Sequence, residues 1–371
     1  MVKKVPMDVY VLGVAIHPAA TAIGDARLEE MAYRTARAAL DDAGVRRADI
    51  DHLTLAASDE LDARGISSML LAAPSGGYLK DEMRTTDSGL TGLHLGAMRV
   101  ASGHLHLGLV VSTSQNSVVD LEDIARMRSE PFFLRPVGMN FAIADGLFAN
   151  AVQQRYGFSE EAVAACLIER SRAARDNPRA VPRDMPRAAD IARSEPIAYP
   201  LRAAHRAPVT DGAVALVIAS GHWVRAHPDA RPLARLAGMA WGVDRYQLDA
   251  DRLASLDVFR QYAMETFKRA DGIGIDDIDV IEFDAQHAWA DLAYQIALQL
   301  PSSTRVSPSG GAWAQNPYFS MGLLNAAEAA LQVSGRAGGH QVDGAKRALA
   351  HGASGFAQQT HGFVVMEGAG R

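Results

Sequence analysis

A few side chains that can do acid or base chemistry stand in separate segments of the sequence. Asp284 stands at the end of the expected strand 280–283 and can act as a base or orient a water molecule. Tyr318 supplies a phenol that can transfer a proton or stabilise an enolate, and His351 an imidazole that can titrate near neutral pH. A lone histidine is more often a core residue, so a structural role stays open for His351 and for His287, which begins the helix after Asp284.

The single cysteine, Cys166, lies in a poor place for a nucleophile. It stands in the apolar helical stretch 162–168, where cysteine behaves as a small hydrophobic residue. One cysteine excludes a disulfide framework within the chain and every multi-cysteine metal site. His104 and His106 form a close histidine pair without a neighbouring cysteine or carboxylate, so we expect no metal site. No Walker phosphate loop and no Rossmann glycine motif occurs.

Composition is that of an ordinary globular protein of 371 residues, 48% of them hydrophobic. The formal charge of −6 is spread without long runs of one sign, which argues against a nucleic acid as the main partner. Apolar runs such as 107–111 and 213–219 are far shorter than the roughly 20 residues that span a bilayer. The N-terminus lacks the pattern of a signal peptide, so we expect a cytoplasmic protein without a membrane segment.

The chain contains an internal duplication. Residues 42–51 and 270–279 repeat each other, with Gly44 matching Gly272, and each copy has a helix before the glycine and a strand after it. The expected helices are 28–43 and 253–270, followed by 90–101 and 319–333. The expected strands are 53–57 and 280–283, followed by 107–112 and 362–367. The pattern predicts two copies of a mixed α/β unit.

An insertion separates parts of the first copy. Residues 118–201 are helical at first and then rich in arginine and proline, and they precede a strand at 214–219. We therefore predict an N-terminal half over residues 1–229 with an inserted loop domain at about 118–205. The C-terminal half covers residues 230–371.

Several motifs stand in an order that resembles the thiolase superfamily, in particular sterol-carrier-protein type thiolases and their relatives in aldol chemistry and acyl transfer. The resemblance covers nearly the whole chain. Asp284-Ala285-Gln286-His287 takes the place of the family's Asn-Glu-Ala-Phe or His-Asp-Ala-Phe motif. The other segments that carry the resemblance are Thr86-Asp87-Ser88-Gly89, Ala101-Ser102-Gly103, Asn177-Pro178-Arg179-Ala180, Pro200-Leu201-Arg202, Thr210-Asp211-Gly212-Ala213, Ser309-Gly310-Gly311, Gln315-Asn316-Pro317 and His351-Gly352-Ala353-Ser354-Gly355.

The sequence departs from the family pattern at two positions that are catalytic in the family. Thr86 stands where the family has a cysteine whose thiolate attacks thioesters, and an alcohol needs a strong adjacent base to do the same. Thr86 either hydrogen-bonds the substrate thioester or caps the following helix. Asn316 replaces the histidine of Gly-His-Pro, so it can donate a hydrogen bond to an oxyanion but cannot shuttle protons. The resemblance therefore does not imply a standard thiolase reaction.

The resemblance also implies ligand-binding positions. His351 corresponds to the head of a catalytic glycine loop. Glycines at the family's turns allow close backbone approach to a ligand, although glycine also simply makes turns. These positions are Ser309, Gly310, Gly311, Gly352 and Gly355. Arg126, Arg128, Arg172 and Arg202 either meet the phosphates of a CoA or phosphopantetheine group or are solvated surface residues.

By resemblance, the expected fold is a duplicated five-layered αβαβα sandwich that forms a homodimer through an edge strand near 107–112. Its site would lie between two helix N-termini, at Thr86 and Asn316. We consider an enzyme without a cysteine nucleophile that forms or cleaves carbon–carbon bonds of acyl-CoA or acyl-carrier protein thioesters by an aldol or Claisen type step, or transfers acyl groups. It would bind no permanent cofactor, and the CoA or phosphopantetheine thioester would be its substrate. The alternative is a non-catalytic subunit that scaffolds an acyltransferase or a zinc-ribbon/OB-fold partner.

Overall fold

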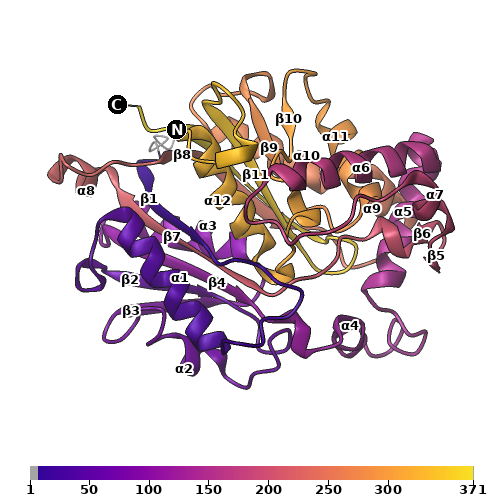
Figure 1. Cartoon of the computed structure of the whole chain (residues 1–371), viewed down its shortest axis with the longest axis horizontal. Coiled ribbons are helices and arrows are strands. Elements are labelled where there is room, and N and C mark those ends of the chain that lie inside the picture. The colour runs from indigo at the N-terminus through magenta and orange to yellow at the C-terminus, as the bar shows by residue number, and fades with distance from the viewer. Residues whose placement is uncertain (1–6, 371) are drawn as a thin grey trace.

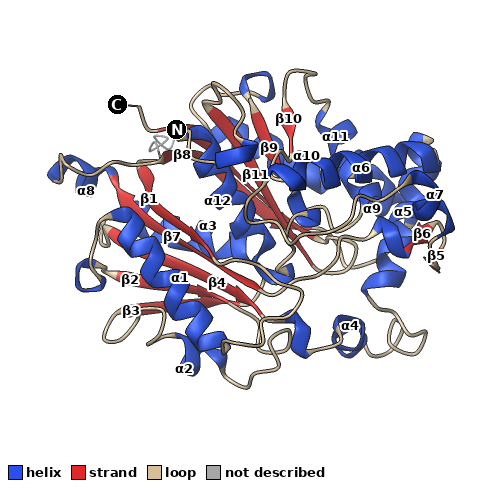
Figure 2. Ribbon diagram, in the orientation of Figure 1, coloured by secondary structure: helices blue, strands red, loops and turns tan. Residues whose placement is uncertain are grey.

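The computed structural model describes residues 7–370, and within them ten strands form one hydrogen-bonded sheet (Figures 1 and 2). The strand order is β10-β9-β11-β12-β8-β1-β7-β4-β2-β3. The first half contributes β1 (Val9–Ile16), β2 (His52–Ala56), β3 (Asp81–Thr85), β4 (Leu107–Ser114) and β7 (Gly212–Ser220). The second half contributes β8 (Ala234–Val243), β9 (Val280–Glu282), β10 (Arg305–Val306), β11 (Arg347–Ser354) and β12 (Thr360–Gly368).

The two halves of the sheet repeat one topology. In the first half, β7 pairs antiparallel with β1 and β4, and β2 pairs parallel with β4 and β3. In the second, β12 pairs antiparallel with β8 and β11, and β9 pairs parallel with β11 and β10. A short ladder between β1 and β8, at Tyr10 with Arg235 and Val11 with Ala234, joins the halves. The predicted duplication is confirmed.

Helices cover both faces of each half and give five layers. Helix α1 (Leu28–Ala43) packs on one face of the first half and α3 (Gly89–Ala101) on the other. Helix α10 (Asp257–Arg269) and helix α12 (Met321–Val333) cover the second half in the same way. Helices α3 and α12 contact each other and form the middle layer, and every residue of α12 is buried. The αβαβα sandwich is the fold that the sequence predicts.

The insertion between β4 and β7 lies at one end of the molecule, on the right in Figure 1. Its larger helices are α4 (Leu121–Arg128), α5 (Phe141–Tyr156), α6 (Glu160–Asp176) and α7 (Ala188–Arg193), beside the hairpin of β5 (Pro196–Ala198) and β6 (Leu201–Arg202). The remaining helices are α2 (Ser67–Leu71), α8 (Gly221–Ala226), α9 (Ala250–Ser255) and α11 (Ala288–Leu298). The boundary predicted at residue 229 lies between α8 and β8 and stays a prediction.

The structure corrects three expectations about elements. Strand β4 lies between β2 and β7, so the expected edge strand near 107–112 is internal, and the edge of this half is β3. The counterpart of β4 is β11, whereas the strand expected at 362–367 is part of β12, the counterpart of β7. The helix expected over 253–270 is interrupted at Leu256, whose φ of 54° is left-handed.

Across the described residues, no helix combines the length and the apolar character needed to cross a membrane.

Candidate functional site

The N-terminus of α3 carries hydroxyl groups and no thiol. Thr86 is exposed in the turn before the helix, and the helix cap is Ser88, whose hydroxyl oxygen accepts a hydrogen bond from the Thr91 N–H. The N-cap role considered for Thr86 is therefore wrong. Asp87 accepts hydrogen bonds from the hydroxyls of Thr91 and Ser354, at 2.7 and 2.6 Å, which ties the start of α3 to the end of β11.

The starts of the two central helices lie against each other. A Cβ atom on Gly89 would come within 3.1 Å of the Ser320 Cα atom, so the first turn of α3 touches the residue before α12. Behind this contact, the Ser320 Oγ atom lies 2.8 Å from the Ser112 Oγ atom and 3.1 Å from that of Ser114. The duplication thus brings the Thr86 and Asn316 segments to the same level of the middle layer.

A chain of hydrogen bonds links two of the predicted site residues through a third side chain. The Gln286 Nε2 atom donates to the Asp284 Oδ1 atom at 2.7 Å, and the Gln286 Oε1 atom accepts from the Asn316 Nδ2 atom at 2.9 Å. The Asp284 Oδ2 atom accepts from the Ala353 N–H at 3.0 Å. Asp284 and Asn316 are buried, whereas Gln286 is half-buried.

Burial sets the acidity of the two candidate acid–base groups. Burial raises the pKa of Asp284 to about 6, against the opposing effect of the hydrogen bonds from Ala353 and Gln286. Burial, with a smaller contribution from the charge of Asp145, also raises the pKa of the Tyr318 phenol. At neutral pH the Asp284 carboxylate can accept a proton, and the Tyr318 hydroxyl keeps its own.

Gln286 and Tyr318 line one cavity of about 590 Å³, called here the Tyr318 cavity. The Tyr318 N–H donates to the Asn116 Oδ1 atom at 3.0 Å, and its ring packs against Phe141 with centroids 5.4 Å apart. The other lining residues are Asn116, Val119, Asp120, Leu121, Glu122, Ile197, Ala203, Arg206, Ala207, Pro208 and Val209. The cavity lies between the insertion and the segment that precedes α12.

Arg206 is the basic group among the residues that line the Tyr318 cavity. Its guanidinium lies 2.8 Å from a Glu122 carboxylate oxygen and 3.6 Å from one of Asp145. Asp145 in turn lies 3.8 Å from the Nε2 atom of His287. His287 itself is buried and caps α11, because its Nδ1 atom accepts the Ala290 N–H at 3.2 Å.

His351 lies in strand β11 and not in the expected glycine loop. Its ring is fully buried, stacks on Phe363 and His361, and hydrogen-bonds the His361 ring across 3.1 Å. Burial and the neighbouring His361 hold the pKa of His351 well below its usual range. His351 lines neither of the two cavities described here, and its role as a base stays a prediction.

The predicted glycine positions pack against protein segments. The Ser309 hydroxyl donates to buried Glu282 at 2.6 Å, and a Cβ atom on Gly310 would lie 2.5 Å from the Ala174 Cα atom. Gly352 packs against Leu90 and Gly322 of the middle layer. Gly311 and Gly355 have positive φ values of 54° and 80°, as turns require. Contact of these residues with a ligand stays a prediction.

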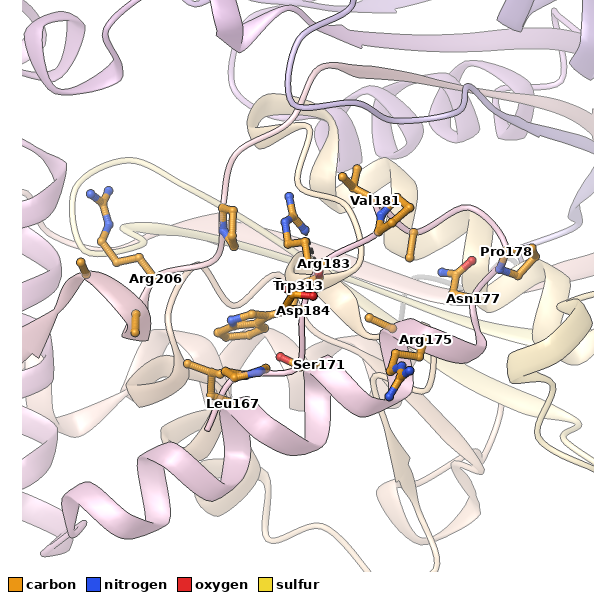
Figure 3. A pocket seen from close by; sticks show the side chains of 17 residues that line it. Leu167, Ser171, Arg175, Asn177, Pro178, Val181, Arg183, Asp184, Arg206 and Trp313 are labelled. Atoms are coloured by element: carbon orange, nitrogen blue, oxygen red, sulfur yellow. Dashed lines mark hydrogen bonds between the residues drawn. The ribbon is translucent and has the colours of Figure 1, made fainter. Parts of the chain in front are cut away.

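A second cavity of about 630 Å³, called here the Trp313 cavity, adjoins the first (Figure 3). Ala203, Arg206 and Pro208 line both cavities. Arg175 and Arg183 also line the Trp313 cavity, and Arg183 donates to the Trp313 carbonyl at 2.9 Å.

The arginines singled out from the sequence lie elsewhere. Arg126 pairs with Asp123 and Arg128 with Glu60, while Arg172 is exposed. Arg202 donates to the Ser194 carbonyl at 3.1 Å. None of the four lines either cavity.

Gln286 and Arg206 are site residues that the sequence analysis did not select. Gln286 was visible inside the Asp284-Ala285-Gln286-His287 segment, where alternate residues after a strand can share one side. Arg206 carried no local signal, because its place depends on how the insertion packs. Within residues 7–370, no cluster of three histidine, cysteine or carboxylate side chains could hold a metal ion.

Comparisons with known proteins give a relative that covers 94% of the chain and a second that covers 44% of it. No family model matches the sequence. An acetyl-CoA acetyltransferase of Methanothermobacter thermautotrophicus is 26% identical over 94% of this chain and 96% of its own length. The sterol carrier protein 2 of Rattus norvegicus is 26% identical over 44% of this chain and 34% of its own length.

Solved structures share the fold. The structure titled Ltp2-ChsH2(DUF35) aldolase superimposes with a TM-score of 0.81 and 18% identity, covering 98% of both chains. An acetyl-CoA acetyltransferase from Syntrophomonas wolfei superimposes with a TM-score of 0.77 and 17% identity, covering 97% of this chain and 98% of that one.

Proposed function

Because the chain belongs to the thiolase superfamily, we propose that it acts on acyl-CoA or acyl-carrier thioesters without forming a covalent acyl intermediate. The reaction would form or cleave a carbon–carbon bond through an enolate. One observation carries this proposal: the wall of the Tyr318 cavity offers the Tyr318 phenol and the Gln286 amide, and that amide hydrogen-bonds buried Asp284 and Asn316 behind the wall. The start of α3 offers Thr86 in place of a thiol.

The cysteine of the chain is unsuited to nucleophilic catalysis. Cys166 is buried in α6, and burial raises the pKa of its thiol well above the usual value. The thiolate is the reactive form, and its population falls as this pKa rises. A threonine hydroxyl at position 86 is far less acidic still, so it needs a strong adjacent base to act as a nucleophile.

The site residues fit the proton transfers of an aldol cleavage. A base takes the proton of a β-hydroxyl group, the Cα–Cβ bond breaks, and the carbonyl product leaves. The electron pair of that bond passes to the Cα atom and the thioester oxygen as an enolate. We assign the base to Asp284, and we assign to Tyr318 the hydrogen bond that stabilises the enolate oxygen.

The Trp313 cavity fits the remainder of such a substrate. It opens beside the Tyr318 cavity at Arg206, and Arg175 and Arg183 add two further guanidinium groups. Guanidinium groups suit phosphate oxygens, and a volume of about 630 Å³ is in the range of ligand sites. We therefore place the phosphopantetheine arm of the thioester in the Trp313 cavity, with its acyl end toward Tyr318.

One of the two comparison structures supports an aldol type of reaction, whereas the other is an acetyl-CoA acetyltransferase. The former is titled an aldolase, and its title names two chains, Ltp2 and ChsH2(DUF35). By analogy we propose that this chain also works with a DUF35 partner subunit. A catalytic chain remains the preferred hypothesis over a pure scaffold, because the wall of the Tyr318 cavity carries the Tyr318 phenol beside the Gln286 amide that hydrogen-bonds Asp284.

Mass spectrometry of products tests the proposal. The purified chain, alone and with a co-purified partner, is incubated with a panel of β-hydroxyacyl-CoAs and acyl-CoAs. We expect a shortened acyl-CoA and a carbonyl product, no mass increase of the protein, and full activity in Cys166→Ala. A covalent acyl adduct, or activity lost in Cys166→Ala while the fold is intact, would overturn it. Absence of both binding and turnover in every preparation would favour the scaffold.

A further inference from the structure

We infer that Gln286 is a positioning residue that makes Asn316 a hydrogen-bond donor or acceptor according to whether Asp284 carries a proton. This inference rests on the proposed function, because it concerns the same site. It is carried by the hydrogen-bond chain from Asp284 through Gln286 to Asn316, in which each amide can face its neighbours in two ways.

In the structure, the donors and acceptors of these hydrogen bonds are arranged as an ionised Asp284 requires. The carboxylate accepts from Gln286, and Gln286 accepts from Asn316. The second Nδ2 proton of Asn316 faces the Ala207 carbonyl at 3.4 Å. Both donors of Asn316 are thereby used, and its Oδ1 atom is buried with no hydrogen-bond partner. In this direction Asn316 offers an acceptor, which cannot stabilise an oxyanion.

A proton on Asp284 favours the opposite direction. The carboxyl O–H then donates to the Gln286 oxygen once that amide turns over, and the Gln286 nitrogen donates to the Asn316 oxygen. The Asn316 amide has also turned, so its nitrogen takes the place of the unpartnered oxygen. The 3.4 Å contact of the Nδ2 atom with the Ala207 carbonyl is given up, in exchange for the Gln286 donor that the Asn316 oxygen gains. In this direction Asn316 offers a donor, as the enolate oxygen requires.

Backbone hydrogen bonds fix the main chain at Asn316 and Gln286 while their side-chain amides turn. The Asn316 N–H donates to the Thr210 hydroxyl at 2.9 Å, and its carbonyl accepts from the Thr210 N–H at 2.9 Å. The Gln286 carbonyl accepts from the Ala207 N–H at 2.9 Å. Side-chain rotation is therefore the motion left to both amides.

The surroundings of Asp284 leave its protonation to burial and to these hydrogen bonds. Its carboxylate accepts from Ala353 and Gln286, and its titratable neighbours are the phenols of Tyr294 on α11 and Tyr318 before α12. Burial raises the pKa of Asp284 to about 6, near the range in which a catalytic base works.

The coupling would synchronise the two halves of the cleavage step. As the β-hydroxyl proton moves to the Asp284 carboxylate, the thioester oxygen becomes an enolate oxygen. The reversed hydrogen bonds would then place the Asn316 N–H where its unpartnered Oδ1 atom now lies. The reversal itself moves no proton and no charge between residues. Reprotonation of the enolate Cα atom by Asp284 would restore the starting direction.

Nuclear magnetic resonance of the full-length, substrate-free protein tests the coupling. The side-chain amide signals of Asn316 and Gln286 and the carboxyl signal of Asp284 are followed over a pH titration. We expect all three to move with one midpoint. In Gln286→Leu the carboxyl midpoint should rise by about one pH unit, because the ionised form loses a donor, and the Asn316 signals should stop titrating.

A matched control uses Gln358, a buried glutamine that also contacts Asp284. The Gln358 Nε2 atom lies 3.4 Å from the Asp284 backbone carbonyl, and Gln358 takes no part in the hydrogen bonds from Asp284 through Gln286 to Asn316. Gln358→Met should therefore leave the shared midpoint unchanged. Asn316 signals that do not titrate in the unaltered protein, or that titrate equally in Gln286→Leu, would overturn the inference. Gln286→Met repeats the test should Gln286→Leu fold poorly. Since no substrate is used, this result is independent of whether the proposed reaction occurs.

Discussion

Tyr318 is the phenol on the wall of the Tyr318 cavity, and its raised pKa keeps the proton on the hydroxyl. Tyr318→Phe removes this donor and little volume. We predict a loss of carbon–carbon bond turnover of about 10²–10⁴-fold with thioester binding retained. Turnover assays and titration calorimetry on the same preparation measure both quantities.

Tyr294 offers the matched control for that substitution. It is another buried phenol, its hydroxyl has no hydrogen-bond partner, and it does not line the Tyr318 cavity. Tyr294→Phe should leave turnover within about twofold, since it removes an unsatisfied group. Equal losses in both variants would mean that the phenol of Tyr318 has no special role.

His351 tests the distinction between a catalytic and a structural histidine. Its ring is buried among Phe259, Tyr294, His361 and Phe363. We predict that His351→Ala lowers the free energy of unfolding by about 2–5 kcal/mol because it leaves a cavity. At a temperature where the variant stays folded, turnover per folded molecule should be nearly unchanged, as measured by denaturant unfolding and single-turnover assays. A loss of turnover above about 100-fold in the folded variant would contradict this expectation and support the role of His351 as a base.

Part of the candidate site could be predicted from the sequence. Asp284, Asn316 and Tyr318 lie at one connected place, because their segments follow a strand or precede a helix of the duplicated unit. His351 was taken for a loop residue, although its segment extends a strand. The orientation of a side chain relative to a cavity depends on packing between distant segments, which a single sequence does not encode locally.

At the scale of elements, the middle layer depends on glycines where α12 approaches β11 and α3. A Cβ atom on Gly322 would lie 2.8 Å from the Gly352 Cα atom and 2.8 Å from the Leu90 Cβ atom. Backbone and Cβ atoms cannot move aside without shifting a helix. We predict that Gly322→Ala lowers the free energy of unfolding by about 1–3 kcal/mol, measured by urea denaturation.

Gly24 is the control for that prediction, since a Cβ atom there meets nothing within 4 Å. Gly24→Ala should change the free energy of unfolding by less than about 1 kcal/mol. A Gly322→Ala variant as stable as Gly24→Ala would show that α3 and α12 are free to separate.

Elements with clear periodicity were predicted well, and the exceptions have physical reasons. The stripe of α1 and its Gly44 cap gave the bounds of that helix, 28–43, correctly. Strand β11 was missed because its sequence, Arg347-Ala-Leu-Ala-His-Gly-Ala-Ser354, has few residues of high strand propensity. It is a strand because β9 and β12 pair with it on both sides. Tertiary pairing overrides local preference here.

At the scale of the whole molecule, buried ionisable groups predict a stability maximum in pH. Burial raises carboxyl pKa values, so the folded state holds protons that the unfolded state loses, and stability falls as pH rises through them. These values are about 6 for Asp284, about 7 for Asp62 and Asp145, and about 8 for Glu282. Burial lowers imidazole pKa values, so stability falls as pH drops below the unfolded value of 6.5. The affected histidines are His52, His94, His205, His287, His351 and His361.

The buried imidazoles and the buried carboxyl groups change the stability over pH ranges that overlap only in part. Between about pH 4 and 6.5 the imidazoles outnumber the carboxyl groups, so stability should rise with pH. Above pH 6.5 only Asp62, Asp145 and Glu282 still titrate, and stability should fall toward pH 8. Urea denaturation at about pH 5, 6.5 and 8 measures this maximum. Glu282→Gln should flatten the alkaline side, and a curve that rises steadily to pH 8 would contradict the assignment.

The edge of the sheet predicts how two copies of the chain associate. Strand β3 exposes one edge, and large apolar side chains are exposed on it and beside it. These are Ile66, Met69, Leu70, Tyr78, Leu79 and Met83, with Leu79 85% exposed. An open edge with apolar neighbours favours pairing with a second strand, and a twofold axis lets β3 pair with its own copy. We therefore propose a homodimer through β3, in place of the strand near 107–112.

Met83 lies at the centre of β3 and would then face its own counterpart across the axis. Met83→Lys would place like charges opposite each other, so the variant should be a monomer at concentrations where the unaltered chain is a dimer. Light scattering coupled to gel filtration measures the mass. Met264→Lys, at an exposed position of α10 in the other half, should remain dimeric. A monomeric unaltered chain would refute the dimer, and a dimeric Met83→Lys would place the contact on another surface. Because β3 leads directly into Thr86 and α3, a β3 interface would also bring the partner's chain close to the start of that helix.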